Sequence, residues 1–483
     1  MVEAEIRRNW IGPAHEGIEI SGDIKIMAHL TEAACLIEQG AMFPSRQGFR
    51  DGAGSTVLIG FKPGACSIYF DDAPIYHFDL EGRWQRAFIG FEAEDPETPR
   101  NLAGVPGVHY LKGLDTSTTG LIRVREGQEI KIQRRSLGYA ESVEMDESVR
   151  RMAMELHTRI ASGELQPVAP PTTGRTAAKP VGNVELLDFL ERVAERDSAA
   201  WSRQKQQFMG TFGPLPMSPP SSPGLVVIQA TMGEFREPPI GFGGARTTSI
   251  HVRTSDEFQR HLHQVISLWG RRMPQARGIY LAGSDLIHQP MPVVLEYLEE
   301  VAKALTETTI DIQGRLIDPP RIPQKSDIYL MTHRLDGPAP TPEMLGEYRA
   351  RGVSHLTLGI ESLDETVRAI YGRCWSNQDL AEWVENAKLA GLPLSLVLIV
   401  GAGGLQYPES TEKTLGCLAD LPLAEGTVIY VVDASETAGQ LNFGLDIADT
   451  NASLLHNLRE SLAIALKPRK VKVAHYTLEK DWQ

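Results

Sequence analysis

The chain has 483 residues, of which 42% are apolar, and a formal charge of −14 at pH 7. That length predicts two or three domains, and that apolar fraction is ordinary for globular cores. The acidic balance excludes a broad nucleic-acid or anionic membrane surface, because such surfaces need clustered lysine and arginine. No apolar run is long enough to cross a bilayer, and the N-terminal residues lack a signal peptide's apolar segment, so we expect a cytoplasmic protein.

The cysteines and paired histidines give no metal signal. Cys35, Cys66, Cys374 and Cys417 are far apart in the sequence. None lies in a CxxC spacing, so we predict neither a metal knuckle nor a disulfide framework. His261-x-His263 lies in a predicted helix, where side chains two positions apart diverge. We therefore expect no metal site.

Residues 1–165 are predicted to form an α+β module. Helical patterns cover Ile24–Gln39 and Met145–Ala161. Turn residues separate four short strand patterns between them: Thr56–Phe61, Cys66–Phe70, Ile75–Phe78 and Trp84–Ile89. Short strands joined by tight turns predict an antiparallel meander.

Residues 166–224 are predicted to be a linker that contains a helix. Gln166–Val181 is rich in Pro, Thr and Ala, and Gly213–Gly224 is rich in Pro and Ser. Between these stretches, Val184–Met209 has a charged helical pattern. We expect this helix to be a solvated connector.

Residues 225–483 alternate between strand and helix patterns. Six short, nearly continuous apolar runs predict strands buried on both faces: Leu225–Gln229, Gly278–Ala282, Ile310–Ile317, Leu356–Ile360, Leu394–Val400 and Val428–Val432. A capping pattern opens the helix predicted over Ser376–Ala390. Six strand–helix units predict a parallel, partial TIM-type (β/α)6 barrel. A doubly wound open sheet is the structural alternative.

Polar residues and glycines follow these predicted strands, and barrels place functional residues at the carboxyl ends of their strands. The candidate catalytic residues are the carboxylates of Glu234, Asp285 and Glu361. Asp285 and Glu361 stand at strand ends, where burial without a role would be costly. Glu234 has the simpler alternative of a solvated loop residue. The candidate cofactor-binding residues are Gly283, Ser284, Arg315 (on the third predicted strand), Ser362, Gly401, Gly403 and Gly404.

From about residue 224 to 480 the chain resembles the radical S-adenosylmethionine (SAM) superfamily. Gly359–Glu365, followed by Tyr371-Gly372-Arg373, is similar to a stretch typical of one branch. Ile399–Gly404 resembles the glycine-rich fifth-strand motif, which implies contact with the adenine of SAM. Ala282–Asp285 stands where the superfamily has its second-strand motif near the methionine amine, and Arg315 matches a third-strand arginine. The resemblance therefore implies a barrel that binds SAM.

The chain departs from this family at the loop after the first strand. The family loop carries three cysteines, whose thiolates hold a [4Fe–4S] cluster. Here the loop Thr231–Gly243 contains no cysteine, and Glu234 occupies the first cysteine position. Proline, glycine or phenylalanine occupies the other two, and none of these side chains can ligate iron. The resemblance thus implies a familiar frame with a degenerate cluster site and no conventional [4Fe–4S] cluster.

Three hypotheses follow for the function. The favoured one is a barrel that binds SAM or a related small ligand and supports non-radical, polar chemistry. The second is a non-catalytic homologue that acts as the partner or scaffold subunit of another enzyme. The third is a radical SAM enzyme with unusual cluster ligands. The glycines of Gly401–Gly404, which let a backbone approach a ligand closely, favour the first.

Overall fold

A computed structural model gives the fold of this chain. It describes residues 45–71, 73–90, 106–126, 129–169, 179–213, 215, 219–220, 224–232, 250–283, 286–306, 309–310, 316–317, 327–433 and 462–476. The predicted helix Ile24–Gln39 lies outside these residues, as do the candidate site residues Glu234, Ser284, Asp285 and Arg315. The chain divides into two compact units, Met1–Gln206 and Gln207–Gln483.

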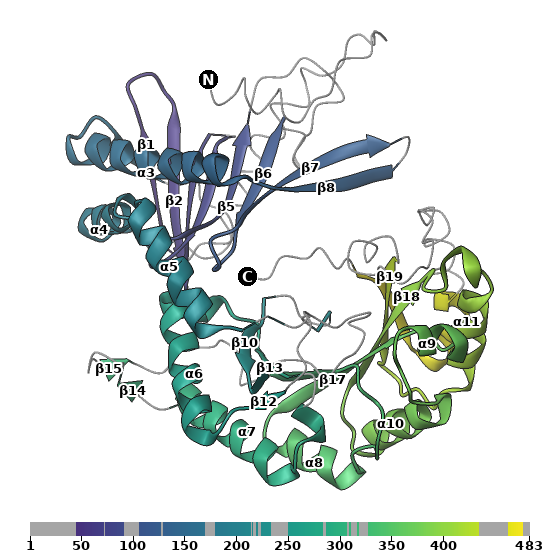
Figure 1. The fold of residues 1–483 in the computed structure, drawn as a ribbon. Coiled ribbons are helices and arrows are strands. Elements are labelled where there is room, and N and C mark those ends of the chain that lie inside the picture. Colours follow the sequence, from purple (N-terminus) through teal and green to yellow (C-terminus); the bar gives the residue numbers. More distant parts are fainter. Residues whose placement is uncertain are drawn as a thin grey trace. The chain divides into compact units, whose positions relative to one another are not determined.

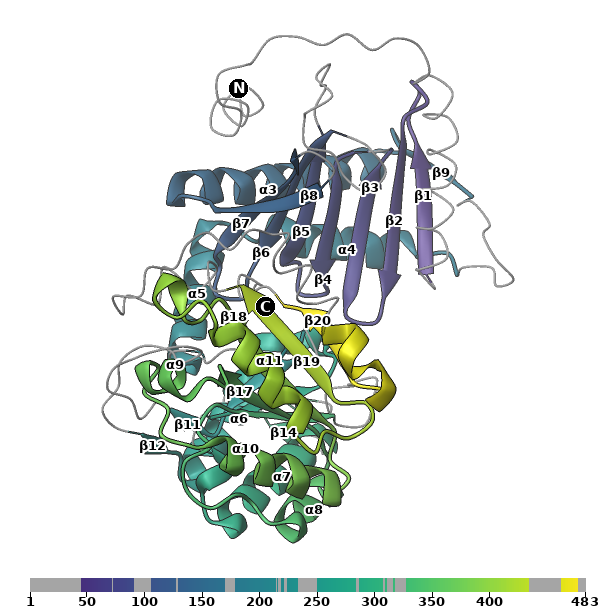
Figure 2. The ribbon, with the colours of Figure 1, turned by 90° about the vertical axis from the view of Figure 1, so that its right-hand side faces the viewer.

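The first unit is built on a nine-stranded antiparallel sheet with the strand order β8-β7-β6-β5-β4-β3-β2-β1-β9 (Figure 2). Its strands are β1 (Ser45–Arg50), β2 (Thr56–Lys62), β3 (Ala65–Phe70), β4 (Ile75–Asp79), β5 (Trp84–Gly90), β6 (Gly107–Lys112), β7 (Thr118–Glu126), β8 (Glu129–Ser136) and β9 (Gln166–Val168). The four predicted strands are confirmed as β2 to β5. The sheet extends the predicted meander by β1 and β6 to β9.

Two helices, α3 (Tyr139–Ala161) and α4 (Asn183–Ala194), contribute to the core of the first unit together with one face of the sheet. α3 begins earlier than the predicted Met145. The single helix predicted over Val184–Met209 is wrong, because the chain forms α4 and then α5 (Ser198–Thr211). The Asp197 carboxylate accepts a hydrogen bond of 2.7 Å from the amide of Ala200, which starts the new helix.

A charged pair lies inside this core. The Lys112 ammonium is 2.9 Å from Oδ2 of Asp146, and Trp84 Nε1 donates a 2.8 Å hydrogen bond to Oδ1 of the same carboxylate. Lys112 Nζ also lies 4.8 Å from the ring centre of Trp201. Burial lowers the pKa of Lys112 and raises that of Asp146, so the hydrogen bonds are needed to keep both groups charged.

The second unit is built on a seven-stranded parallel sheet (Figure 1). Its strands, in sheet order, are β10 (Val226–Gln229), β13 (Ile279–Ala282), β16 (Ile328–Thr332), β17 (Val353–Glu361), β18 (Leu394–Val400), β19 (Val428–Asp433) and β20 (Lys472–His475). The order in the sheet follows the order in the chain. That rules out the doubly wound alternative, in which the strand order reverses, and confirms the predicted barrel-type α/β class.

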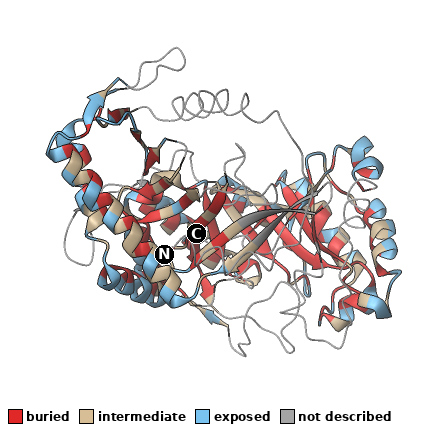
Figure 3. Ribbon diagram, turned by 90° about the horizontal axis from the view of Figure 1, so that it is seen from above, coloured by how far each residue is buried: buried red, intermediate tan, exposed pale blue. Residues whose placement is uncertain are grey.

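The main helices of this unit lie along the outer side of the curved sheet (Figure 1). They are α6 (Ser255–Trp269), α7 (Met291–Thr306), α8 (Pro342–Ala350), α9 (Glu365–Ile370), α10 (Asn377–Leu389) and α11 (Ser410–Asp420). Every residue of β18 is buried, so this central strand is covered on both faces. Figure 3 shows that buried residues concentrate in the strands, while exposed residues lie mainly on the helices. None of the helices in the described ranges is both long and apolar enough to span a membrane.

The third parallel strand is not the predicted Ile310–Ile317. In that region β14 (Thr309–Ile310) and β15 (Leu316–Ile317) pair antiparallel with each other, as a separate two-stranded sheet. β16 instead pairs in parallel with β13 and β17. The third strand of the parallel sheet therefore ends at Thr332, while the candidate Arg315 lies outside the described residues.

Candidate ligand site at the carboxyl ends of the parallel strands

Buried polar side chains gather where the parallel strands end. Thr231 follows β10, Thr332 ends β16, Glu361 ends β17, and Ser362 comes next; each is at most 3% exposed. The carboxyl ends of parallel strands meet at one edge of a sheet, which is the usual place for ligand sites in α/β folds. The structure thus brings the candidates Glu361, Ser362, Gly283 and Gly401 to this carboxyl edge.

Glu361 is held by a buried cation. Arg373 Nε donates a 2.9 Å hydrogen bond to Oε2 of Glu361, and Nη2 of Arg373 contacts Oε1. A register shift between Gly359 and Glu361 interrupts the pairing of β17 with β18, and Glu361 itself has a φ of 48°. Because its carboxylate is fully buried and ion-paired, Glu361 anchors the end of β17. It is poorly suited to be a free acid or base.

Ser362 joins the end of β17 to α11. Its hydroxyl lies 3.0 Å from Oγ1 of Thr414 and accepts a 3.1 Å hydrogen bond from the amide of Asp364. The Leu363 amide donates to the same threonine oxygen at 3.0 Å. Thr414 was not singled out from the sequence. Its spacing of four from Ser410, which places both hydroxyls on one helix face, was the available signal.

The glycines after β18 form a tight turn. Gly401 and Gly404 have φ values of 80° and 56°, and the Gly404 amide donates a 2.9 Å hydrogen bond to the Gly401 carbonyl. A Cβ on Gly403 would approach the Tyr407 carbonyl oxygen and the Ser410 Oγ to 2.5 Å. The turn therefore needs glycine for its own geometry. Its glycines alone do not indicate a ligand.

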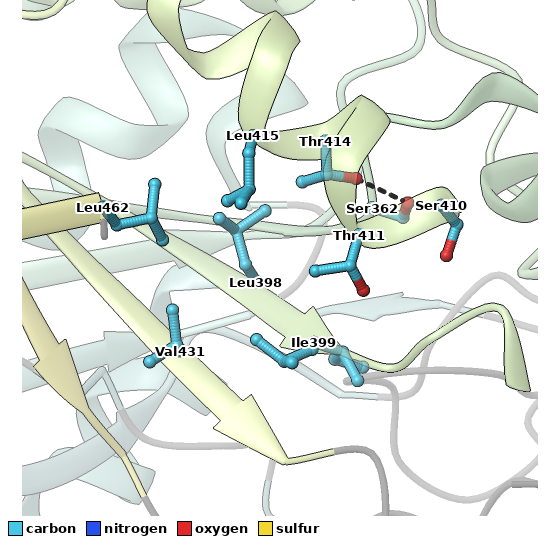
Figure 4. Close-up of a pocket in the computed structure, with 10 residues that line it drawn as sticks. Ser362, Leu398, Ile399, Ser410, Thr411, Thr414, Leu415, Val431 and Leu462 are labelled. Atoms are coloured by element: carbon cyan, nitrogen blue, oxygen red, sulfur yellow. Dashed lines mark hydrogen bonds between the residues drawn. The ribbon is translucent and has the colours of Figure 1, made fainter. Parts of the chain in front are cut away.

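A small cavity lies beside this turn, under α11 (Figure 4). Hydroxyls from Ser362, Ser410, Thr411 and Thr414 line one part of it. Aliphatic side chains, including Leu398, Val431 and Leu462, line the rest. Its volume is about 10 Å³, the space of one water molecule. A larger ligand would therefore have to bind at the rim of this cavity.

The other end of the carboxyl edge has an unpartnered hydroxyl. Thr231 Oγ1 is buried and has no hydrogen-bond partner among the residues that the structure describes. Gly283 lies against it, since a Cβ at Gly283 would come within 2.3 Å of that oxygen. Just beyond β10, β11 (Thr231–Met232) pairs antiparallel with β12 (His251–Val252). This short ladder closes the base of the loop that lacks cysteines.

His261, in α6, forms a hydrogen bond with the backbone of β10. The Gln229 amide donates a 2.9 Å hydrogen bond to Nε2 of His261, and Nδ1 lies 3.0 Å from the Thr211 carbonyl oxygen. Burial lowers the pKa of His261 to about 3, so the imidazole is neutral and Nδ1 carries the proton. Both ring nitrogens are occupied by the backbone, which leaves neither for a metal ion.

The described cysteines do not fit a conventional iron–sulfur cluster, which needs three neighbouring thiolates. The loop after β11 contains no cysteine. Of the described cysteines, Cys66 is buried in the first unit, and Cys374 and Cys417 follow later strands of the second unit. Within the described ranges, no three His, Cys, Asp or Glu side chains come together as a metal-binding group.

No protein-family model matches the chain, and no curated protein matches it. Among solved structures, it is similar to the radical SAM enzyme coproporphyrinogen III oxidase from Escherichia coli, with 15% identity, a TM-score of 0.32, and coverage of 44% of this chain and 46% of that one. It is also similar to the radical SAM methyltransferase TsrM from Kitasatospora setae, with 12% identity, a TM-score of 0.31, and coverage of 43% and 35%. The cobalamin-dependent SAM radical enzyme OxsB has 13% identity, a TM-score of 0.30, and coverage of 63% and 35%.

These three neighbours are radical SAM enzymes, the family that the sequence motifs resemble. The chain spans less than half the length of each of them. Because the overlaps have TM-scores near 0.3, we rest no functional statement on them.

Proposed function

We propose that the second unit binds SAM or a related small molecule at the carboxyl edge of its parallel sheet. The main support is the set of buried polar side chains at that edge, above all the unpartnered hydroxyl of Thr231. A buried hydroxyl without a partner costs free energy, which a hydrogen-bonding ligand would recover. SAM offers suitable groups in its ribose hydroxyls, its amine and its carboxylate.

We further propose that this binding does not use a conventional [4Fe–4S] cluster, because the loop after β11 lacks the three thiolates. No radical step is then available through such a cluster. Acid–base chemistry would then fall to the other two candidate carboxylates, Glu234 and Asp285, since the Glu361 carboxylate is paired with Arg373.

Calorimetric titration of the full chain with SAM tests the ligand site. We expect saturable heat, and a loss of affinity of about 3- to 10-fold in Thr231→Val and in Ser362→Ala, the effect of losing one hydrogen bond. Thr366→Val is the matched control, because Thr366 is exposed on α9. Absence of heat with SAM, adenosine and S-adenosylhomocysteine would reject the site and favour the scaffold hypothesis.

Anaerobic reconstitution with iron and sulfide tests the absence of a conventional cluster. We expect no cluster absorbance band beyond that of an unrelated protein treated in the same way. A stoichiometric band would show that other ligands hold a cluster, and would support the third hypothesis. This result is independent of the calorimetry, so each half of the proposal can fail separately.

A further inference from the structure

The inner face of the parallel sheet is the one turned away from α11. Leu398 and Val431 line the cavity under α11, so they mark the outer face. Side chains alternate along a strand, which places the neighbouring positions of β17, β18 and β19 on the inner face. The strand register brings five inner-face residues of interest together, and we call them the inner cluster: Tyr329, His355, Thr357, Ser395 and Tyr430.

Barrel interiors are usually filled with branched apolar side chains, but the inner cluster is rich in hydrogen-bonding groups. His355 Nε2 lies 2.7 Å from Ser395 Oγ, and the His355 ring packs against the Tyr329 ring with 5.8 Å between their centres. Burial lowers the pKa of His355 to about 4, so this imidazole is neutral at pH 7. Its second ring nitrogen has no hydrogen-bond partner among the described residues.

Thr357 supplies a second unused group. Its side chain is fully buried, and its Oγ1 has no hydrogen-bond partner within the described part of the chain. In the sheet register it lies directly between Met331 of β16 and Ser395 of β18. A valine would fill the same space without the cost of an unpaired hydroxyl, so packing alone does not account for a threonine here.

The cluster is also enclosed by aromatic rings. Burial raises the pKa of Tyr430, and Tyr329 adds to that shift although two strands separate them in the sheet. The strand register places the two tyrosines on the same face of the sheet, on either side of β17 and β18. Tyr476 packs edge-on against Tyr430, with 6.2 Å between ring centres.

We infer that the inner cluster binds a small uncharged molecule that has an aromatic ring and both a hydrogen-bond donor and an acceptor. The tyrosine and histidine rings offer flat apolar contacts, while Thr357 Oγ1 and His355 Nδ1 offer the hydrogen bonds. The cluster offers a neutral imidazole and hydroxyl groups but no Lys, Arg, Asp or Glu, so a charged ligand would be desolvated without compensation. The inner cluster is distinct from the carboxyl edge, because His355 and Ser395 lie near the amino ends of β17 and β18.

Benzimidazole is a suitable probe at about pH 8, where it is uncharged and carries one N–H donor and one acceptor nitrogen. We expect saturation-transfer NMR to show binding to the full chain. Thr357→Val should weaken that binding by about 5-fold or more without lowering the thermal midpoint, because it removes only an unpaired hydroxyl. Thr357→Ser should retain binding, and the exposed Thr366→Val should change nothing.

Two results would overturn this inference. One is the absence of benzimidazole binding to the wild-type chain, which would leave ordered water as the partner of Thr357. The other is equal binding to wild type and Thr357→Val. SAM titration of Thr357→Val distinguishes the inner cluster from the carboxyl edge, since we expect this variant to bind SAM with unchanged affinity.

Discussion

Arg373 and Glu361 form a buried ion pair that fixes the end of β17. The guanidinium is 5% exposed and the carboxylate is fully buried, with 2.9 Å between Nε and Oε2. Glu361 also has a left-handed backbone, which costs a residue other than glycine about 1 kcal/mol. The ion pair offsets that cost, so the backbone before Ser362 depends on a side chain that comes from the segment after α9.

Replacing Arg373 with methionine should destabilise the second unit by about 3 kcal/mol, because it leaves a buried carboxylate without its cation. Hydrogen exchange of the amides of β17 measures this as a local opening free energy. Glu361→Gly/Arg373→Met should recover much of the loss, since it removes the buried charge and suits the left-handed backbone.

Lys388→Met is the control for Arg373→Met. Lys388 pairs with Glu385 on the exposed side of α10, where both side chains are at least 40% exposed. We expect a change below about 1 kcal/mol. An equally small change in Arg373→Met would show that the buried pair does not hold the end of β17.

Gly403→Ala should destabilise the turn after β18 by about 1–3 kcal/mol, because the new methyl group would meet the Tyr407 carbonyl and Ser410 Oγ. Gly416→Ala is a matched control, since nothing lies within 4 Å of its Cβ position in α11. That change should stabilise the helix by about 1 kcal/mol. Hydrogen exchange of α11 in both variants measures the difference, and a harmless Gly403→Ala would contradict the steric account.

Lys112→Met should destabilise the first unit by about 3 kcal/mol, because it leaves the buried Asp146 carboxyl group without its cation. Lys112→Met/Asp146→Leu should regain most of that loss by removing both charges. Arg150→Met is the control, since Arg150 pairs with Glu147 where both side chains are at least 31% exposed. Hydrogen exchange of the β6 amides measures the opening free energy in all three variants. A double variant as unstable as Lys112→Met would show that the buried Asp146 carboxyl group is not the cause of the loss.

The contact between His261 and β10 should weaken in acid. The pKa of His261 is about 3 in the folded chain, whereas an unperturbed histidine has a pKa of 6.5, so only the unfolded state gains a proton between these two pH values. The contribution of His261 to the free energy of unfolding is therefore complete above about pH 6.5. Below that pH the free energy of unfolding falls by up to about 1.4 kcal/mol per pH unit.

Hydrogen exchange of β10, measured at several pH values and corrected for the intrinsic rates, reports this effect because the Gln229 amide donates to His261. His261→Gln should flatten the dependence, since glutamine does not titrate in this range. His77 also has a lowered pKa, of about 4, but it lies in the first unit and serves as an internal comparison. An identical pH slope in His261→Gln would exclude His261 as its source.

Local patterns predicted most of the strands that shape the candidate site. The apolar runs at Leu394–Val400 and Val428–Val432 form β18 and β19, since strands buried on both faces require such runs. The third strand could not be chosen in this way. Ile310–Ile317 and Ile328–Thr332 are both rich in apolar residues, and only pairing with β13 and β17 selects the second.

Contacts made by the candidate residues were harder to predict than their positions. The sequence placed Glu361 at a strand end, but its pairing with Arg373 depends on how the chain turns after α9. The sequence pattern of the glycines at Gly401–Gly404 predicts contact with a ligand, whereas the fold also needs these glycines for the turn. The inner cluster joins side chains from three different strands, and no single stretch of sequence contains that information.

The pairing of β11 with β12 holds together the two ends of the loop that lacks cysteines. Thr231 pairs with Val252 and Met232 with His251, so the two ends of the loop stay together whatever lies between them. Insertions, deletions and substitutions in that interval need not move β10 or α6. Substitutions that remove or add metal ligands in this loop therefore do not require any change in the structure of the surrounding sheet.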